Sequence, residues 1–156
     1  MSLEQDLQQE QVDRLDLSDF VTVEIGTSVG TTVKKMREAH HNCAIILDQG
    51  KLVGIFTDRD ILQKIADQPE TWSLPIDDFM TPSPLTVPAS APASEALALM
   101  DEHRFRNVPV VNQETGEVIG NLTHYAIIKY LADRFPESVY NQAPQPNRVP
   151  RKRDGA

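Results

Sequence analysis

The sequence predicts an α+β fold in which two β-α-β-β-α repeats pack sheet to sheet with pseudo-two-fold symmetry. Two observations lead to this prediction. Residues 33–66 and 97–132 repeat one pattern of apolar side chains and glycines, with Gly54 aligned to Gly120. Each copy holds about 60 residues, and a unit of that size has one sheet with an apolar face that a second copy can cover.

Each copy begins with a short strand, at residues 21–23 and 85–87, and continues into a helix. Thr27 or Ser28 can begin the first helix, and Pro92 suits the first turn of the second. Apolar side chains recur three and four residues apart, as on one buried helical face. These residues are Val29, Val33 and Met36 in the first copy, and Ala93, Leu97 and Met100 in the second.

A β-hairpin and a closing helix complete each copy. The hairpin strands are expected at 43–47 and 52–56, and at 108–111 and 118–122. The second copy is longer by two residues at the turn, where a hairpin tolerates an insertion without shifting either strand. The closing helices are indicated by Ile61, Leu62 and Ile65, and by Ile127, Ile128 and Leu131.

The chain divides into four predicted segments: an N-terminal extension (1–16), two domains (17–75 and 76–138), and a Pro-rich basic tail (139–156) that is expected to be disordered. Proline-rich residues 67–84 are expected to link the two copies. In the extension, the spacing of leucines suggests an amphipathic helix lying over the pair. These are Leu3, Leu7 and Leu15.

Composition and charge exclude several classes of protein. The net charge of −8 disfavours a nucleic-acid binder, because such proteins need a basic face. No apolar run approaches the ~20 residues that span a bilayer, and the acidic, Gln-rich N-terminus is unlike a signal peptide, so we expect a cytoplasmic protein. Cys43 is the single cysteine and lies in an apolar run. It is interpreted as a small buried hydrophobe, and a disulfide scaffold is excluded.

Residues 50–62, 76–100 and 106–123 carry a resemblance to a known family. Their sequences are GKLVGIFTDRDIL, IDDFMTPSPLTVPASAPASEALALM and RNVPVVNQETGEVIGNLT. They resemble the cystathionine-β-synthase (CBS) domain, which occurs as tandem pairs called Bateman modules, and the resemblance covers roughly residues 17–135. It implies a ligand sensor that binds adenine nucleotides in clefts between the two copies.

The resemblance also implies which residues form each site. In the family pattern G-x-x-[ST]-x-x-D the hydroxyl and the Asp bind ribose, and Gly54, Thr57 and Asp60 match it fully. Arg59 matches an Arg that often reaches phosphate. Positions that hold the base map to Asp19, Val21, Cys43 and Ala44 in the first copy. The second copy has Ser83, Leu85, Asn107 and Val108, with Thr123 and His124 in the motif; it has Ala126 where the first has Asp60, so this second site is expected to be degraded.

The residue chemistry supports a ribose-phosphate ligand independently. A carboxylate such as that of Asp60 can accept two hydrogen bonds from a cis-diol. The same segment begins a helix, whose free N–H groups favour phosphate, and Arg59 adds a planar donor group. A ribose-phosphate could therefore satisfy this short segment.

Other interpretations of these residues remain open. Thr57 and Asp60 also fit a capping box, which needs no ligand, and Thr123 can cap its helix without an acidic partner. A metal site at His40, His41 and Cys43 is disfavoured, because adjacent helical histidines point apart. The usual catalytic motifs are absent from the sequence, so we expect no enzyme.

The sequence therefore predicts a non-catalytic regulatory module that binds AMP, ADP, ATP or a related adenosyl compound and relays that binding to a protein partner. No cofactor is required, and no nucleic acid, membrane or metal is expected as a partner. A homodimer is expected by resemblance alone. The alternatives are a protein-interaction module with vestigial sites, or the regulatory subunit of a separately encoded enzyme or transporter.

Overall fold

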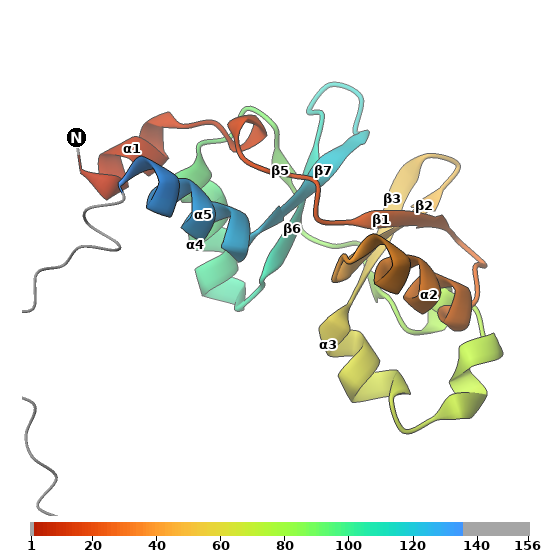
Figure 1. Ribbon diagram of the computed structural model, residues 1–156. Coiled ribbons are helices and arrows are strands. Elements are labelled where there is room, and N and C mark those ends of the chain that lie inside the picture. The colour runs from red at the N-terminus through yellow and green to blue at the C-terminus, as the bar shows by residue number, and fades with distance from the viewer. Residues whose placement is uncertain (1, 136–156) are drawn as a thin grey trace, which may run out of the picture.

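Two β-sheets organise the chain (Figure 1). The computed structural model describes residues 2–135, and the expected tail, 139–156, lies outside them. One sheet has the strand order β1-β2-β3-β4 and the other β5-β6-β7. The strands are β1 (Val21–Glu24), β2 (Cys43–Asp48), β3 (Lys51–Thr57), β4 (Thr81–Pro82), β5 (Val87–Pro88), β6 (Asn107–Val111) and β7 (Val118–Thr123). The predicted α+β architecture of two repeats is confirmed.

The helices follow the predicted order. They are α1 (Leu3–Gln9), α2 (Val29–Ala39), α3 (Asp58–Asp60), α4 (Ala93–His103) and α5 (His124–Arg134). Helix α2 begins after Ser28, whose hydroxyl accepts a hydrogen bond from the Thr31 amide at 3.1 Å. Val29 and Met36 are buried on its inner face, as their spacing predicts.

Both hairpins form as predicted. β2 and β3 pair antiparallel, and the two-residue turn between them, Gln49 and Gly50, has positive φ at both positions, as a type I′ turn requires. In the second repeat the longer turn is organised by Asn112, whose side-chain oxygen accepts hydrogen bonds from the amides of Glu114 and Thr115. The two extra residues therefore lie in the turn and leave both strands in register.

The closing helices of the two repeats differ. In the second repeat α5 is a regular helix, whereas α3 makes one turn and continues as a π-helical segment, η2 (Ile61–Ile65). The Ala66 amide bonds to the Ile61 carbonyl at 2.9 Å, which is the wider hydrogen bond of a π-turn. The predicted first helix of this pair is thus present but irregular directly after Asp60.

The linker does more than connect the repeats. Residues 67–84 form the short 3₁₀ helices η3 (Pro69–Ser73) and η4 (Ile76–Asp78) as well as β4, which pairs antiparallel with β3. The Ser83 amide still bonds to the Val53 carbonyl at 3.1 Å, and Ser83 has a left-handed φ of 47°. The strand expected at 85–87 therefore begins only at Val87.

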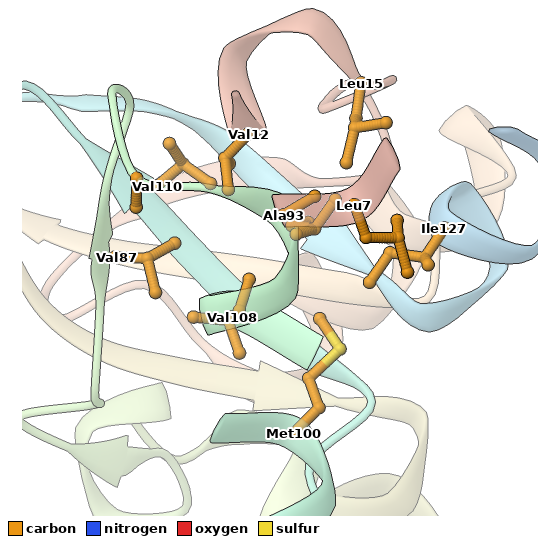
Figure 2. Close-up of a cluster of buried hydrophobic side chains, with 12 residues drawn as sticks. Leu7, Val12, Leu15, Val87, Ala93, Met100, Val108, Val110 and Ile127 are labelled. Atoms are coloured by element: carbon orange, nitrogen blue, oxygen red, sulfur yellow. The ribbon is translucent and has the colours of Figure 1, made fainter. Parts of the chain in front are cut away.

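The N-terminal residues likewise pack on the opposite repeat, so that the two repeats exchange segments. The 3₁₀ helix η1 (Val12–Arg14) and the residues around it pack on the second repeat, and Ser18 forms a bridge with Asn121 of β7. Figure 2 shows Leu7, Val12 and Leu15 in one core with side chains from β5, α4, β6 and α5. We call residues 19–83 the first lobe, and residues 2–18 with 84–135 the second lobe.

Helix α1 thus belongs to the second lobe and does not lie over the pair (Figure 1). It ends at Gln9, so Leu15 is not part of the predicted amphipathic helix. The Tyr130 hydroxyl of α5 donates to the Asp6 carboxylate and to Glu10 Oε2 at 3.1 Å, and Arg134 Nε lies 3.2 Å from Asp6 Oδ1. These contacts hold α1 on the end of α5.

The two repeated glycines allow the exchanged segments to approach. A Cβ on Gly54 would lie 2.8 Å from Met80 Cγ, and a Cβ on Gly120 would lie 2.7 Å from the carbonyl oxygen of Leu17. Both distances are too short for a side chain. A side chain at either position would therefore push away the segment that arrives from the other repeat.

The lobes meet through the faces of their sheets. Buried Cys43, Ile45 and Ile55 form a small apolar cluster on the first sheet, and Val118 of β7 packs against it from the second. This arrangement agrees with the predicted sheet-to-sheet packing. Across the described residues, no helix is long and apolar enough to cross a membrane.

Candidate functional site: three strand ends beside Asp60

The first candidate site forms where three strands end together. β1 and β2 run parallel and β3 runs back, so the starts of the first two strands meet the end of the third. Val21 pairs with Ala44, and Cys43 pairs with Thr57. The structure therefore brings these four predicted residues to one edge of the sheet, with Asp60 one helical turn beyond them.

Asp60 is buried, and both of its carboxylate oxygens have partners. Oδ2 accepts hydrogen bonds from the Thr57 amide at 2.9 Å and the Thr57 hydroxyl at 3.4 Å, and Oδ1 lies 3.0 Å from Lys64 Nζ. Thr57 and Asp60 thus form the capping box that the sequence offered as an alternative. The ion pair with Lys64 was missed, although the four-residue spacing on a predicted helix is a signal for it.

Asp19 lies beside this edge. Its Oδ1 is 3.0 Å from His41 Nδ1 and accepts a longer hydrogen bond, 3.4 Å, from the Asn42 amide. The Asn42 carbonyl in turn accepts from the Asp58 amide at 3.1 Å, which ties the start of α3 to the start of β2. His41, at which the sequence disfavours a metal site, is therefore the partner of a carboxylate.

Cys43 is completely buried, as predicted. Burial, reinforced by the negative charges of Asp19, Asp58 and Asp60, raises the pKa of its thiol far above the usual range. The thiol is therefore protonated at neutral pH and acts as a packing group. This shift also identifies the three carboxylates as electrostatic neighbours of the site.

Arg59 extends from the exposed side of α3 and forms no ion pair among residues 2–135. Its amide donates to Asp58 Oδ1 at 2.9 Å. The guanidinium is consequently available at the helix start. The free N–H groups expected there from the sequence are not free, because the Asp58 amide bonds to the Asn42 carbonyl and the Arg59 amide to Asp58 itself.

The second candidate site is assembled less completely. Asn107 and Thr123 pair at the equivalent strand ends, and Val108 is buried beside them. Thr123 caps α5 by accepting a hydrogen bond from the Ala126 amide at 3.1 Å, as expected for a cap without an acidic partner. Leu85, however, is 45% exposed and outside β5, and Ser83 bonds to the first sheet.

His124 starts α5 at the position of Asp58. Its amide bonds to the Arg106 carbonyl at 3.1 Å, and its ring lies 4.1 Å from that of Tyr125. The ring atom Nδ1 is buried without a partner among the described residues. The second site therefore presents imidazole and phenol groups where the first presents carboxylates and a guanidinium.

One residue at this edge was not anticipated. Asn121 of β7 is completely buried, and its Nδ2 donates hydrogen bonds to Asn107 Oδ1 and to the Asp19 carbonyl, both at 3.0 Å. The sequence gives no signal for this role, because the residue lies in an apolar strand and its partner Asp19 is remote along the chain.

A pocket also lies away from the strand ends of both candidate sites. It has a volume of about 630 Å³ and lies between α1 and the end of α5. It is lined by Asp6, Tyr130, Asp133, Arg134 and Phe135. Asp6, Tyr130 and Arg134 are already engaged in holding α1, so we place the candidate site at the strand ends rather than here.

A family comparison identifies this arrangement. The model of the CBS domain matches the chain twice, at residues 12–67 and 76–133. The chain belongs to the CBS domain family. The first match begins at η1 and the second at η4, so each CBS domain starts on the segment that packs into the opposite lobe.

Curated relatives contain this CBS pair within longer chains. The chain is 35% identical over 107 residues to the CBS domain-containing protein CBSCBSPB1 of Arabidopsis thaliana, covering 64% of this chain and 19% of that protein. It is 30% identical over 134 residues to the Meiotically up-regulated gene 70 protein of Schizosaccharomyces pombe, covering 80% and 18%. An inosine-5′-monophosphate dehydrogenase of Korarchaeum cryptofilum matches at 35% over 107 residues, covering 69% and 21%. The chain thus spans about a fifth of the length of these relatives.

Solved CBS structures share the fold over most of their length. CBSX2 in complex with AMP has a TM-score of 0.67 and 28% identity, covering 80% of this chain and 97% of that one. The CBS domain pair of protein MJ0100, in complex with 5′-methylthioadenosine and S-adenosyl-L-methionine, has a TM-score of 0.71 and 25% identity, covering 80% and 98%. The predicted family and fold are confirmed.

Proposed function

We propose that the chain is a non-catalytic regulatory module that binds an adenosine-containing nucleotide between its two CBS domains. The observation that carries the proposal is the meeting of Val21, Ala44 and Thr57 at one sheet edge, beside Asp60 at a helix start. Backbone groups at the strand ends can hold a base, the carboxylate can accept from ribose hydroxyls, and Arg59 can meet phosphate.

The ligand class is supported by similar proteins. CBSX2 binds AMP, and the MJ0100 pair binds 5′-methylthioadenosine and S-adenosyl-L-methionine. All three ligands share an adenosine moiety. We therefore assign AMP, ADP, ATP or a related adenosyl compound as the ligand, with no cofactor required.

The binding signal would pass to a partner through the helices. Leu62 and Ile128 occupy equivalent positions of the two closing helices and are 75% and 53% exposed, and Tyr125 is 62% exposed. Large exposed apolar side chains on the closing helix of each repeat suit a homodimer face or a partner protein. The module would thus act as a homodimer, or as the regulatory subunit of a separately encoded enzyme or transporter. We place it in the cytoplasm, where a chain whose single cysteine is buried and free needs no oxidising conditions to fold.

Thermal unfolding in the presence of nucleotides tests the proposal. The panel is AMP, ADP, ATP, S-adenosylmethionine and 5′-methylthioadenosine, with inorganic phosphate and adenine as controls for the parts. A ligand at 100 times its Kd should add about 2.7 kcal/mol to the free energy of unfolding, which raises Tm by several degrees. No shift from any nucleotide at millimolar concentration would refute the proposal.

A second candidate function rests on a different observation. Both oxygens of Asp60 are already engaged, by Thr57 and Lys64. A carboxylate used in this way suits a structural capping role, and the chain would then be a protein-interaction module with vestigial ligand sites. The same panel separates the two functions, because only the first requires a nucleotide to stabilise the protein.

A further inference from the structure

A buried amide occupies a position where the other repeat has an apolar side chain. Asn121 follows Gly120 on β7, as Ile55 follows Gly54 on β3. Ile55 packs in the apolar cluster between the sheets, whereas Asn121 is completely buried with a polar side chain. Burying an amide is unfavourable unless its hydrogen bonds are made.

The donor side of this amide is fully used, and its two bonds go to different lobes. Nδ2 donates to Asn107 Oδ1, at the strand end of the second site, and to the main-chain carbonyl of Asp19, beside the first site. The acceptor Oδ1 is buried without a partner among the described residues. An aliphatic side chain would avoid that cost, so stability alone does not account for an asparagine here.

Further hydrogen bonds continue from Asp19 to the helix start of the first site. Asp19 Oδ1 accepts from the Asn42 amide at 3.4 Å, and the Asn42 carbonyl accepts from the Asp58 amide at 3.1 Å. Asn121 therefore bonds directly to Asn107 of the second site. Three successive hydrogen bonds, through Asp19 and Asn42, connect Asn121 to the start of α3 at the first site.

From this juxtaposition we propose that Asn121 is a positioning residue shared by the two sites. It holds the Asn107 side chain of the second site and the Asp19 backbone of the first in fixed relation, so that a change at one site is felt at the other. The inference rests on the proposed nucleotide sites for its ligand, but the positioning itself is a property of the ligand-free protein.

The test compares Asn121→Leu, which keeps the branch at Cγ but has no donor, with the matched control Ile55→Val. Amide hydrogen exchange of the full-length, ligand-free protein is measured by NMR at Asn42 and Asp58. Exchange at both amides should rise several-fold in Asn121→Leu and stay unchanged in the control. Unchanged exchange at both amides in a folded Asn121→Leu protein overturns the positioning role. If that variant does not fold, Asn121→Ala takes its place.

Calorimetry with AMP then gives the second readout. Affinity at the Asp60 site should fall by at least about 5-fold in Asn121→Leu, the lower end of couplings between protein sites, although the substitution lies in the other repeat. Wild-type affinity in the variant contradicts the shared role. If wild-type protein binds neither AMP nor the rest of the nucleotide panel, the proposed function fails, and the exchange measurement alone decides the role of Asn121.

Discussion

The capping of α3 by Asp60 and its proposed binding of ribose compete for the same carboxylate oxygens. A carboxylate has about four acceptor positions, and Thr57 and Lys64 already occupy three of them. One position on Oδ1 is left for a ribose hydroxyl, so the second hydroxyl of the diol would have to share Oδ2 with the Thr57 donors or displace Lys64 from Oδ1. The capping role and the proposed ribose-binding role of Asp60 can therefore be separated by changing the length of this side chain.

We predict that Asp60→Glu keeps stability and loses binding. Glu is the common partner in a capping box, so the free energy of unfolding should change by less than about 0.5 kcal/mol. The longer side chain moves the carboxylate away from the ribose, so AMP affinity should fall by about 10-fold or more, which corresponds to ~1.4 kcal/mol. Asp60→Ala should lose both, with a stability loss of about 1 kcal/mol.

Urea unfolding and calorimetry check these outcomes, and Ala126→Asp provides the reciprocal control. This change restores at the second site the carboxylate that the repeat lacks, and AMP stoichiometry should rise with it. AMP binding by Asp60→Glu with wild-type affinity would return Asp60 to a purely structural role.

At the scale of elements, the exchanged segments determine whether Gly54 or Gly120 is less tolerant of a side chain. At Gly120 a side chain would meet the main-chain carbonyl of Leu17, whereas at Gly54 it would meet the flexible side chain of Met80. We therefore predict that Gly120→Ala lowers the free energy of unfolding by about 1–3 kcal/mol, as overpacking does, and Gly54→Ala by less. Urea denaturation of the two variants measures the difference, and equal losses would contradict a rigid crossing at Leu17.

The attachment of α1 to α5 predicts that the free energy of unfolding falls at alkaline pH. Burial, together with hydrogen bonds to Asp6 and Glu10, raises the pKa of Tyr130 above its ordinary value of 10.0. Because the folded state holds the proton more tightly, this stabilisation is fully present below about pH 10 and is lost as pH rises through the raised pKa. Tyr130→Phe should cost about 1–2 kcal/mol at neutral pH and should flatten the decline above pH 10.

Thermal unfolding from pH 7 to 11 tests this, with Tyr125→Phe as the control, since Tyr125 is 62% exposed. A decline above pH 10 that is equally steep in wild type and Tyr130→Phe would show that Tyr130 does not cause it.

Local patterns predicted the elements well because the forces that form them act over a few residues. The buried face of α2 and the hairpin turn at Gln49 and Gly50 are determined by neighbours in the sequence. β4 and the bond from Asn121 to Asp19 could not be predicted in this way, because their partners are remote in the chain. The strand ends of the site followed from the predicted topology, whereas the contacts that hold them together did not.

At the scale of the whole molecule, the exchanged segments join the two lobes into one structure. Val12 belongs to the first CBS domain yet is buried in the core of the second lobe, and Ile76 of the second CBS domain is buried in the core of the first. Neither lobe can complete its core without a segment from the opposite domain. Such mutual dependence favours a single cooperative unfolding transition.

The single tryptophan allows this cooperativity to be measured. Trp72 lies in η3 of the first lobe, where it packs over Gly30 of α2, so its fluorescence reports on that lobe alone. Val12→Ala removes apolar volume from the core of the second lobe, which should cost about 2 kcal/mol. In a cooperative structure this loss moves the Trp72 transition and the far-UV circular dichroism transition together, to a urea midpoint lower by about 1 M.

Ile76→Ala, which acts in the lobe that Trp72 reports, is the positive control. A Trp72 midpoint that stays at its wild-type value in Val12→Ala, while circular dichroism shows an early second-lobe transition, would mean that the lobes unfold independently.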